Sequence, residues 1–329
     1  MTNYDVVTIG ETMLRLTPPN FLRLGQAKSL DVEVGGSESN TAVGLGRLGA
    51  KVAWVSRLPR NPLGEIVTQT LTGYGVDTSY VQWSDRDRLG LYFYEEGPAP
   101  RGSRVIYDRA GSALSRMVPA HLPEGLFQPG RARLLHLTGI TPALSESVAQ
   151  TLQKAVTLAK QAGWLLSFDV NYRGKLWTTT AARMGCAPFV ATADILFMPL
   201  RDAVAIYGVA GDAETAVSQL SHEFPHATIV LTLGKEGAIG CEANGGHIVR
   251  QPSFPAAGEI GRLGGGDAFT AGFLYGYLYA NDNPLPNALR WGAATAAIKY
   301  TIPGDMPLIE KSEVEALLTS DGLGRRLSR

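Results

Sequence analysis

The sequence predicts an α/β fold, with a doubly wound and mainly parallel sheet that carries a small β lid. Strand-like and helix-like runs alternate over most of the 329 residues, which is the order found in parallel sheets with helical crossovers. The strand-like runs are apolar without period-two alternation, as expected of strands that helices cover on both faces. Two stretches interrupt this alternation with β-type segments, and these stretches predict the lid.

The expected elements of the main sheet follow one another along the chain. A first strand at 4–9 is followed, after the pair Gly35-Gly36, by a helix of small residues at 37–48. Later strands are expected at 51–55, 133–137, 164–170, 194–198 and 228–233, and helices at 145–161 and 213–224. The apolar run AFTAGFLYGYLYA predicts a last helix that starts near Ala268. No internal repeat or low-complexity segment divides the chain, so one domain over residues 1–329 is expected.

The lid is predicted from residues 13–34 and 89–109. These stretches contain the segments MLRLT, LDVEV, LGLYFYEE and SRVIYDR without a helix between the members of each pair. We expect them to pair with each other as a discontinuous sheet outside the main one. Apolar edges on such a sheet favour pairing with another copy, so a homo-oligomer formed through the lid is expected.

Composition excludes several classes of function. Lysine plus arginine total 30 and aspartate plus glutamate total 30, so the net charge of zero indicates no nucleic-acid surface. The two cysteines, Cys186 and Cys241, form no metal-type or disulfide pattern. No apolar run reaches the ~18 residues of a membrane span. A cytoplasmic protein with small-molecule partners, and with neither nucleic-acid nor membrane partners, is expected.

A glycine-rich turn marks the candidate catalytic site. Gly264, Gly265 and Gly266 precede Asp267 and the last predicted helix. Glycine backbone N–H groups and the free N–H groups of a helix start can together bind a phosphate anion. An aspartate at that point can accept the proton of an attacking hydroxyl as general base. The alternative interpretation is that Asp267 is an ordinary N-cap after a flexible loop.

Three further motifs accompany this turn, although each one alone is more typical of a turn than of a site. They are GG-x-x-x-N from Gly35, D-x-N-x-R from Asp169 and T-x-G-x-x-G from Thr232. Together with G-x-G-D-A-F from Gly264, in this order and spacing, they resemble the PfkB carbohydrate kinases over nearly the whole chain. Within that family, FDVNYRGKLW, IYDRAGSALS and the late PGD look most like 2-keto-3-deoxygluconate kinases.

This resemblance implies a ribokinase-like fold and assigns roles to individual residues. Asp267 matches the catalytic base, and the three glycines before it match the anion hole. Thr232, Gly234 and Gly237 match the ATP-binding turn. The sugar-binding positions implied by the resemblance are Gly35, Gly36, Asn40, Tyr92, Tyr107, Arg109, Arg173 and Asp305. The tyrosines could instead be ordinary cross-strand residues, the arginines surface or ion-pair residues, and Asp305 a turn residue.

Two departures from the family pattern concern cations. The family has Asp-Thr before the glycine signature, where this chain has Gly261-Arg262. Because that aspartate organises a monovalent-cation loop in related kinases, potassium activation is doubtful. The N-x-x-E motif near the magnesium site reads MPLRD here, with Asp202 as its only carboxylate. Mg²⁺ is expected to arrive with ATP, held largely by phosphate and water, and the sequence assigns no metal ligand.

The function implied is an ATP-dependent transfer of the γ-phosphoryl group to a hydroxyl of 2-keto-3-deoxygluconate. Two alternatives remain open at this point. One is a fructokinase- or ribokinase-like activity on a neutral sugar, for which cationic side chains at the acceptor would have little purpose. The other is a non-catalytic sugar-binding relic of the fold, against which the intact GGGD sequence argues. Fold alone does not choose among them.

Overall fold

The computed structural model describes residues 4–209, 211–256, 258, 260–261, 263–280, 282 and 284–319. The main sheet of this part of the chain has ten strands in the order β14-β13-β12-β11-β10-β9-β1-β4-β5, with β6 beside β4. The pairs from β5 through β12 are parallel, and β13 and β14 are antiparallel additions. The strands are β1 (Tyr4–Ile9), β4 (Val52–Pro59), β5 (Val76–Asp77), β6 (Val81–Ser84), β9 (Ala132–Thr138), β10 (Leu165–Asp169), β11 (Ile195–Pro199), β12 (Thr228–Thr232), β13 (Ala238–Cys241) and β14 (Ile248–Gln251).

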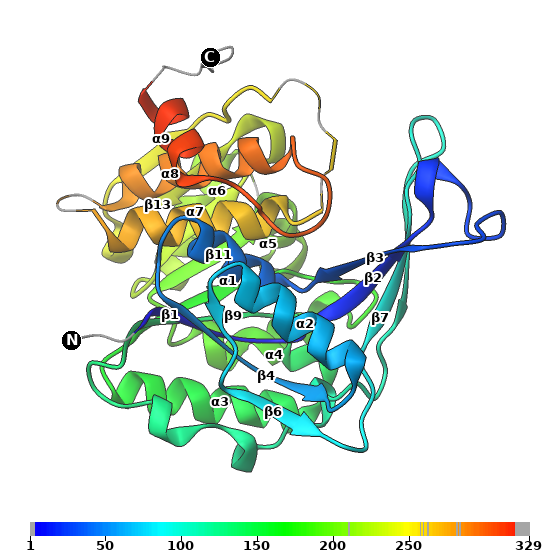
Figure 1. Cartoon of the computed structure of the whole chain (residues 1–329). Coiled ribbons are helices and arrows are strands. Elements are labelled where there is room, and N and C mark those ends of the chain that lie inside the picture. The colour runs from blue at the N-terminus through cyan, green and yellow to red at the C-terminus, as the bar shows by residue number, and fades with distance from the viewer. Residues whose placement is uncertain are drawn as a thin grey trace.

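Helices cover both faces of the main sheet, as Figure 1 shows. Val7 and Ile9 of β1 pack into a core shared with α3 to α6, whereas Val6 packs into a second core with α1, α2, α7, α8 and α9. The helices are α1 (Ser37–Arg47), α2 (Pro62–Gly73), α3 (Glu146–Gln161), α4 (Thr179–Val190), α5 (Leu200–Tyr207), α6 (Ala213–Glu223), α7 (Gly265–Leu278), α8 (Pro284–Lys299) and α9 (Lys311–Thr319). The predicted doubly wound fold is therefore confirmed.

The second sheet has four strands in the order β3-β2-β7-β8. They are β2 (Met13–Thr17), β3 (Asp31–Gly35), β7 (Leu91–Glu95) and β8 (Arg104–Asp108). In Figure 1 this sheet extends away from the main body. Both predicted lid stretches contribute strands, so the expected small sheet is confirmed. Because β3 ends at Gly35 and α1 begins at Ser37, the lid leads directly into the first helix.

The start of one helix and several further elements differ from the sequence predictions. Helix α7 begins at Gly265 rather than near Ala268, because Gly264 takes the N-cap position with φ +74°. Several other elements were not expected, although Asn61 followed by Pro62 is a helix-start signal for one of them. They are α2, α4, α5, α8, α9, β5, β6 and the antiparallel pair β13–β14. Within the ranges that the structure describes, no helix is long and apolar enough to cross a membrane.

Candidate active site

Two adjoining cavities lie at the carboxyl ends of β10, β11 and β12, where open α/β sheets bind ligands. The larger has a volume of about 880 Å³ and the smaller about 220 Å³. The predicted ATP-binding residues Thr232, Gly234 and Gly237 all line the larger cavity. Residues that line both cavities include Pro199, Arg201, Thr232, Gly265 and Gly266. The start of α7 is therefore the point at which the two cavities meet.

The glycine turn at this junction approaches its neighbours too closely for side chains at two positions. A Cβ on Gly264 would lie 1.8 Å from the backbone oxygen of Asp305, and the φ of Gly264 is +74°. A Cβ on Gly265 would lie 2.6 Å from the ring of Tyr300. Gly266, by contrast, has no atom within 4 Å of its Cβ position and faces open space. The free N–H groups of the first turn of α7 thus border the cavities, and together with the glycine turn they form a nest of the kind that binds anions in other proteins.

Asp267 lies in the first turn of α7, two residues after the helix begins, and is not the N-cap of that helix. Its Oδ1 accepts a hydrogen bond of 2.7 Å from Ser37 Oγ, and its Oδ2 accepts one of 2.8 Å from Asn40 Nδ2. Ser37 Oγ in turn accepts a hydrogen bond of 2.9 Å from Asn171 Nδ2. Burial raises the pKa of Asp267 above the ordinary value, and the bonds from Ser37 and Asn40 oppose this rise. A buried carboxylate is therefore held in a fixed orientation beside the glycine nest.

The glycine pair at the end of the lid allows close packing of polar groups. A Cβ on Gly35 would lie 2.4 Å from the hydroxyl oxygen of Tyr92 and 2.7 Å from Oδ2 of Asp305. A Cβ on Gly36 would lie 2.1 Å from the backbone oxygen of Glu11. The Tyr92 hydroxyl donates to Asp305 Oδ2. Three of the predicted sugar-binding residues, Gly35, Tyr92 and Asp305, are thus in mutual contact.

Arg15 is the cation that this cluster contains, and the sequence did not indicate it. Its side chain is buried, and its Nη1 and Nη2 pair with Asp305 Oδ1 and Glu33 Oε2. Arg15 Nε is buried without a hydrogen-bond partner in the described residues. Burial, followed by the charge of Asp305, raises the pKa of Tyr92, so this phenol remains protonated and donates. Asp305 is therefore held by a cation on one oxygen and a phenol on the other.

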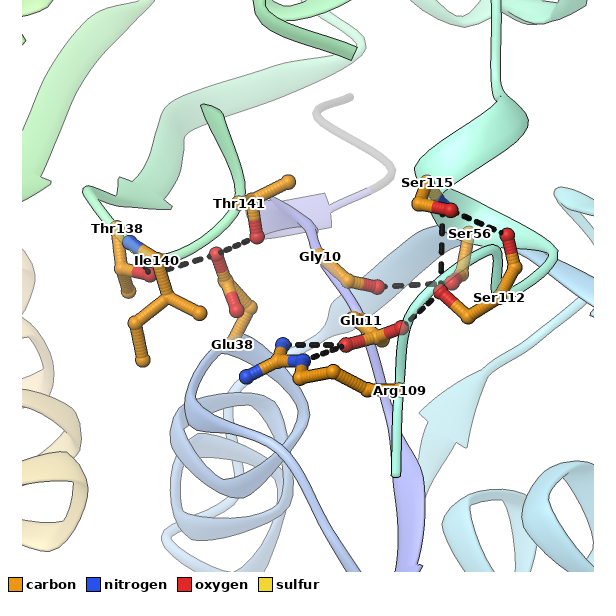
Figure 2. Close-up of polar contacts among 10 residues, drawn as sticks. All are labelled: Gly10, Glu11, Glu38, Ser56, Arg109, Ser112, Ser115, Thr138, Ile140 and Thr141. Atoms are coloured by element: carbon orange, nitrogen blue, oxygen red, sulfur yellow. Dashed lines mark hydrogen bonds and ion pairs between the residues drawn. The ribbon is translucent and has the colours of Figure 1, made fainter. Parts of the chain in front are cut away.

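Tyr107 and Arg109 continue the same wall at the end of lid strand β8. The rings of Tyr92 and Tyr107 lie 5.9 Å apart, and the Arg109 guanidinium lies 5.6 Å from the Tyr107 ring centre. Arg109 donates from Nε and Nη2 to Oε2 of Glu11, while Glu11 Oε1 accepts from Ser112 Oγ (Figure 2). Arg109 lines neither of the two cavities. Without a bound ligand, Arg109 is therefore paired with Glu11, and this pair does not decide between a substrate-binding and an ion-pair role.

Arg173 is exposed and lines the smaller cavity together with Asp169, Asp202 and Asp267. Burial raises the pKa of Asp169 to about 7, with the charge of Asp267 adding to the rise, and burial also raises the pKa of Asp202. Among the described residues, no group of three or more His, Cys, Asp or Glu side chains is arranged to hold a metal ion. Asp169 and Asp202 are hard oxygen ligands that suit Mg²⁺ already bound to phosphate.

Helix α1 is fixed at its start by a second buried carboxylate, Glu38. Its Oε1 accepts a hydrogen bond of 2.8 Å from Thr138 Oγ1 and one of 2.6 Å from Thr141 Oγ1 (Figure 2). Thr138 is the last residue of β9, and Thr141 lies just after that strand. Burial raises the pKa of Glu38 to about 7 despite these two bonds, and the charge of Asp267 contributes. The turn that supplies Ser37 and Asn40 to Asp267 is therefore tied to the main sheet.

Comparison with known proteins decides the family. The pfkB family carbohydrate kinase model matches residues 3–311. The chain belongs to this family of carbohydrate kinases. The kinase is 41% identical over 320 residues to a 2-dehydro-3-deoxygalactonokinase of Haloferax volcanii, covering 97% of this chain and 98% of that one. It is 30% identical over 307 residues to a 2-dehydro-3-deoxygluconokinase of Bacillus subtilis, covering 92% and 91%. The crystal structure of a 2-dehydro-3-deoxygluconokinase from Thermotoga maritima matches with a TM-score of 0.85 and 32% identity, covering 96% of this chain and 100% of that chain.

Several polar residues of the kinase's site escaped sequence reasoning. Ser37 bonds to Asp267, Glu11 pairs with Arg109, and Arg15 pairs with Asp305. Glu11 directly follows Gly10 at the end of β1, a position where polar residues of open α/β sheets commonly serve a site, so this signal could have indicated it. Arg15 lies within a lid strand, and its pairing with Glu33 across the sheet and with the distant Asp305 explains its place.

Proposed function

We propose that this kinase transfers the γ-phosphoryl group of MgATP to a hydroxyl of a 2-keto-3-deoxy sugar acid, of the gluconate or galactonate series. The observation that carries the proposal is the position of Asp267. Its buried carboxylate is fixed by Ser37 and Asn40 in the smaller cavity, directly after the glycine nest at which the two cavities meet. The names of the relatives support the choice of acceptor, since they are kinases of 2-dehydro-3-deoxy sugar acids.

In this proposal the larger cavity takes ATP. Thr232, Gly234 and Gly237 line it at the end of β12, and its volume of about 880 Å³ is sufficient for a nucleotide. Mg²⁺ would reach the site on the phosphates and meet Asp169 and Asp202 in the smaller cavity. When bound, the ion neutralises phosphate charge. The residues that line the two cavities then orient the triphosphate of ATP toward the start of α7.

Asp267 acts as the general base that accepts the acceptor's hydroxyl proton. The N–H groups of Gly264, Gly265 and Gly266 face the phosphoryl group as it acquires charge, and Arg173 on the cavity wall adds a positive charge. The N–H groups and the base are preorganised, because the helix start fixes the first and the Ser37–Asn40 pair fixes the second before any ligand binds. The acceptor hydroxyl therefore needs only to be positioned between them.

The acceptor is held by the wall that joins the lid to the main sheet. Gly35, Gly36 and Asn40 form the part of this wall where β3 ends and α1 begins. Polar groups for the sugar hydroxyls come from Tyr92, Tyr107 and Asp305. Arg109 is the group we assign to the carboxylate of the sugar acid. Its Nη1 is not used in the pair with Glu11, so an arginine fork remains able to donate to an incoming carboxylate.

We further propose that residues 1–329 form one kinase domain and that 13–34 and 89–109 are its lid. The lid sheet is edged by β3 and β8, and it exposes Val32 and Ile106 on those edge strands. Exposed apolar edge strands favour pairing with a second copy. A homo-oligomer joined through the lids is the assembly that this surface supports.

One observation favours a second candidate function, phosphorylation of a neutral ketose. Arg15 and Arg109 are both already paired with carboxylates, Asp305 and Glu33 for the first and Glu11 for the second. A wall whose cations are neutralised within the protein has less charge to offer an acidic acceptor. The two functions differ in acceptor only, so the same assay separates them.

The test is a panel of acceptors with MgATP, read as ADP release. We expect 2-keto-3-deoxygluconate or 2-keto-3-deoxygalactonate to give the highest kcat/KM, with fructose and ribose lower by about tenfold or more, the size of one lost charge-assisted contact. Omitting Mg²⁺ serves as the control for nucleotide chemistry. A higher kcat/KM for fructose would establish the neutral-sugar candidate, and release of ADP with no acceptor dependence would contradict both.

A further inference from the structure

Lys299, the last residue of α8, carries a fully buried ammonium group. Its exposed fraction is 0%, and its Nζ donates 2.9 Å bonds to the backbone oxygens of Ile302 and Gly304. Burying a charge costs free energy unless the charge is bound, and these two hydrogen bonds offset part of that cost for the Lys299 ammonium group. Burial lowers its pKa to about 8, against the opposing charge of Asp305, which leaves the group protonated at pH 7.

The segment that Lys299 holds forms the back of the candidate active site. The backbone oxygen of Asp305 lies against Gly264, and the ring of Tyr300 lies against Gly265. The Asp305 side chain bonds to Tyr92 and Arg15 in the acceptor wall. One short loop, residues 300–305, therefore contacts both the glycine nest and the acceptor wall, and Lys299 binds its backbone from inside.

The two carbonyl oxygens also face the segment that precedes the glycine turn. A Cβ on Gly261 would lie 3.4 Å from Ile302 O and 3.9 Å from Gly304 O. Beside it, the N–H group of Ile260 donates a hydrogen bond of 2.8 Å to the backbone oxygen of Tyr300. Converging backbone carbonyls are typical ligands of monovalent cations. The family resemblance places a cation loop at this segment, yet the aspartate expected there is Gly261, and Arg262 lies outside the described residues. The carbonyl oxygens are occupied by an ammonium group, so a free potassium ion does not fit them.

We propose that Lys299 is a built-in cation that takes the place of a free monovalent ion and positions the 300–305 loop against the glycine nest. It touches neither ATP nor acceptor in this arrangement, so it is a positioning residue. The inference rests on the carbonyl geometry and on kinase activity, and it is independent of which acceptor is preferred.

The experiment compares wild type with Lys299→Ala and Lys299→Met in tetramethylammonium, potassium and ammonium chloride at one ionic strength. Turnover is measured with whichever acceptor the wild type prefers, and thermal unfolding is measured without ligands. We expect wild-type turnover to change less than about twofold among the salts. Lys299→Ala should lose about 10²-fold in turnover, the lower end of the range for losing one preorganised donor, and should recover about tenfold or more as ammonium or potassium refills the space.

The variants separate charge from packing. Lys299→Met fills the space without charge, so it should remain slow in every salt. Lys51→Ala, which removes an exposed lysine at the other end of the sheet, should resemble wild type. If Lys299→Ala folds too poorly to assay, its unfolding midpoint should rise with ammonium or potassium concentration, since a bound ion stabilises the folded state. Strong activation of the wild type by potassium would overturn the proposal, as would a variant that no cation restores in turnover or in stability.

Discussion

Asp267 illustrates how opposing effects adjust one carboxylate for its proposed chemistry. Burial in the first turn of α7 raises its pKa, and donors on α1, Ser37 and Asn40, lower it. A base must lose its proton near the working pH and still attract the proton of a hydroxyl. The two donors also fix the orientation of both carboxylate oxygens. Position and basicity therefore have the same structural source.

The first prediction at this scale concerns the removal of that base. Asp267→Asn keeps the size of the side chain but cannot accept the proton, so turnover should fall by roughly 10²- to 10⁴-fold, the span for a positioned general base. ATP affinity, measured by titration calorimetry, should change little, because the larger cavity does not include Asp267. Near-normal turnover would remove Asp267 from the mechanism.

A related pH measurement checks the sign of the pKa argument. The base works deprotonated, so activity is lost as the pH falls through the pKa of Asp267, and burial places this acidic limb above that of an ordinary aspartate. Asn40→Ala removes a donor that favours the charged form, so the limb should move to higher pH. A limb that moves to lower pH, or does not move, would show that another group controls it.

At the residue scale, the sequence predicted those site residues that adjoin one another along the chain. Gly264 to Asp267 form one contiguous motif, and the structure places them together at two cavities. Asn40 and Tyr92, which bond to distant partners, were reached only through the family resemblance, and Ser37 and Arg15, which that resemblance did not mark, were missed. Ser37 meets Asp267 across 230 positions, and Arg15 meets Asp305 across 290. Such pairs are created only by the crossing of lid, sheet and helices, which no local pattern records.

At the scale of elements, the start of α7 combines rigidity with open space. Gly264 and Gly265 are closed in by Asp305 and Tyr300, so a side chain at either position would disturb the fold before it reached a ligand. Gly266 points into the open junction of the two cavities. The three glycines therefore serve different purposes, two for packing and one for access.

This difference gives a prediction for Gly266→Val. The branched side chain should enter the space reserved for the phosphoryl group and lower turnover by about 10²-fold or more, as when a preorganised donor is lost. The unfolding midpoint should remain within a few degrees of wild type, because no protein atom lies within 4 Å of the new Cβ. Gly73→Val on α2, also with open space around its Cβ, is the matched control. Normal turnover in the Gly266 variant would mean that the turn is only a connection.

The main elements were predictable because their patterns are long and buried on both sides. The strand 4–9 coincides with β1, and the predicted helix 145–161 differs from α3 by only its first residue, Ser145, whose hydroxyl caps α3. The short strands β13 and β14 have four residues each, too few for a periodic signal. The start of α7 was misplaced because glycines are poor helix formers, and here tertiary contacts with Asp305 and Tyr300 override that preference.

On the scale of the whole molecule, the lid and the main sheet meet at buried ion pairs. Glu11 follows β1 of the main sheet, and Arg109 follows β8 of the lid. Their side chains are only 3% and 10% exposed, so removing one partner leaves an unpaired buried charge and is strongly destabilising. A test of Arg109 therefore needs a background in which Glu11 is neutral. Otherwise a loss of fold would be read as a loss of acceptor binding.

The most direct measurement of the central claim is the acceptor preference of Glu11→Gln/Arg109→Leu compared with Glu11→Gln alone. Losing a buried partner of a charge costs about 2–5 kcal/mol, so KM for the 2-keto-3-deoxy sugar acid should rise roughly 30-fold to several thousand-fold. Activity on fructose should change by less than about threefold, because that acceptor presents no carboxylate. This selective loss is the result that our account predicts. Equal losses on both acceptors would contradict the assignment of Arg109 to the carboxylate of the sugar acid.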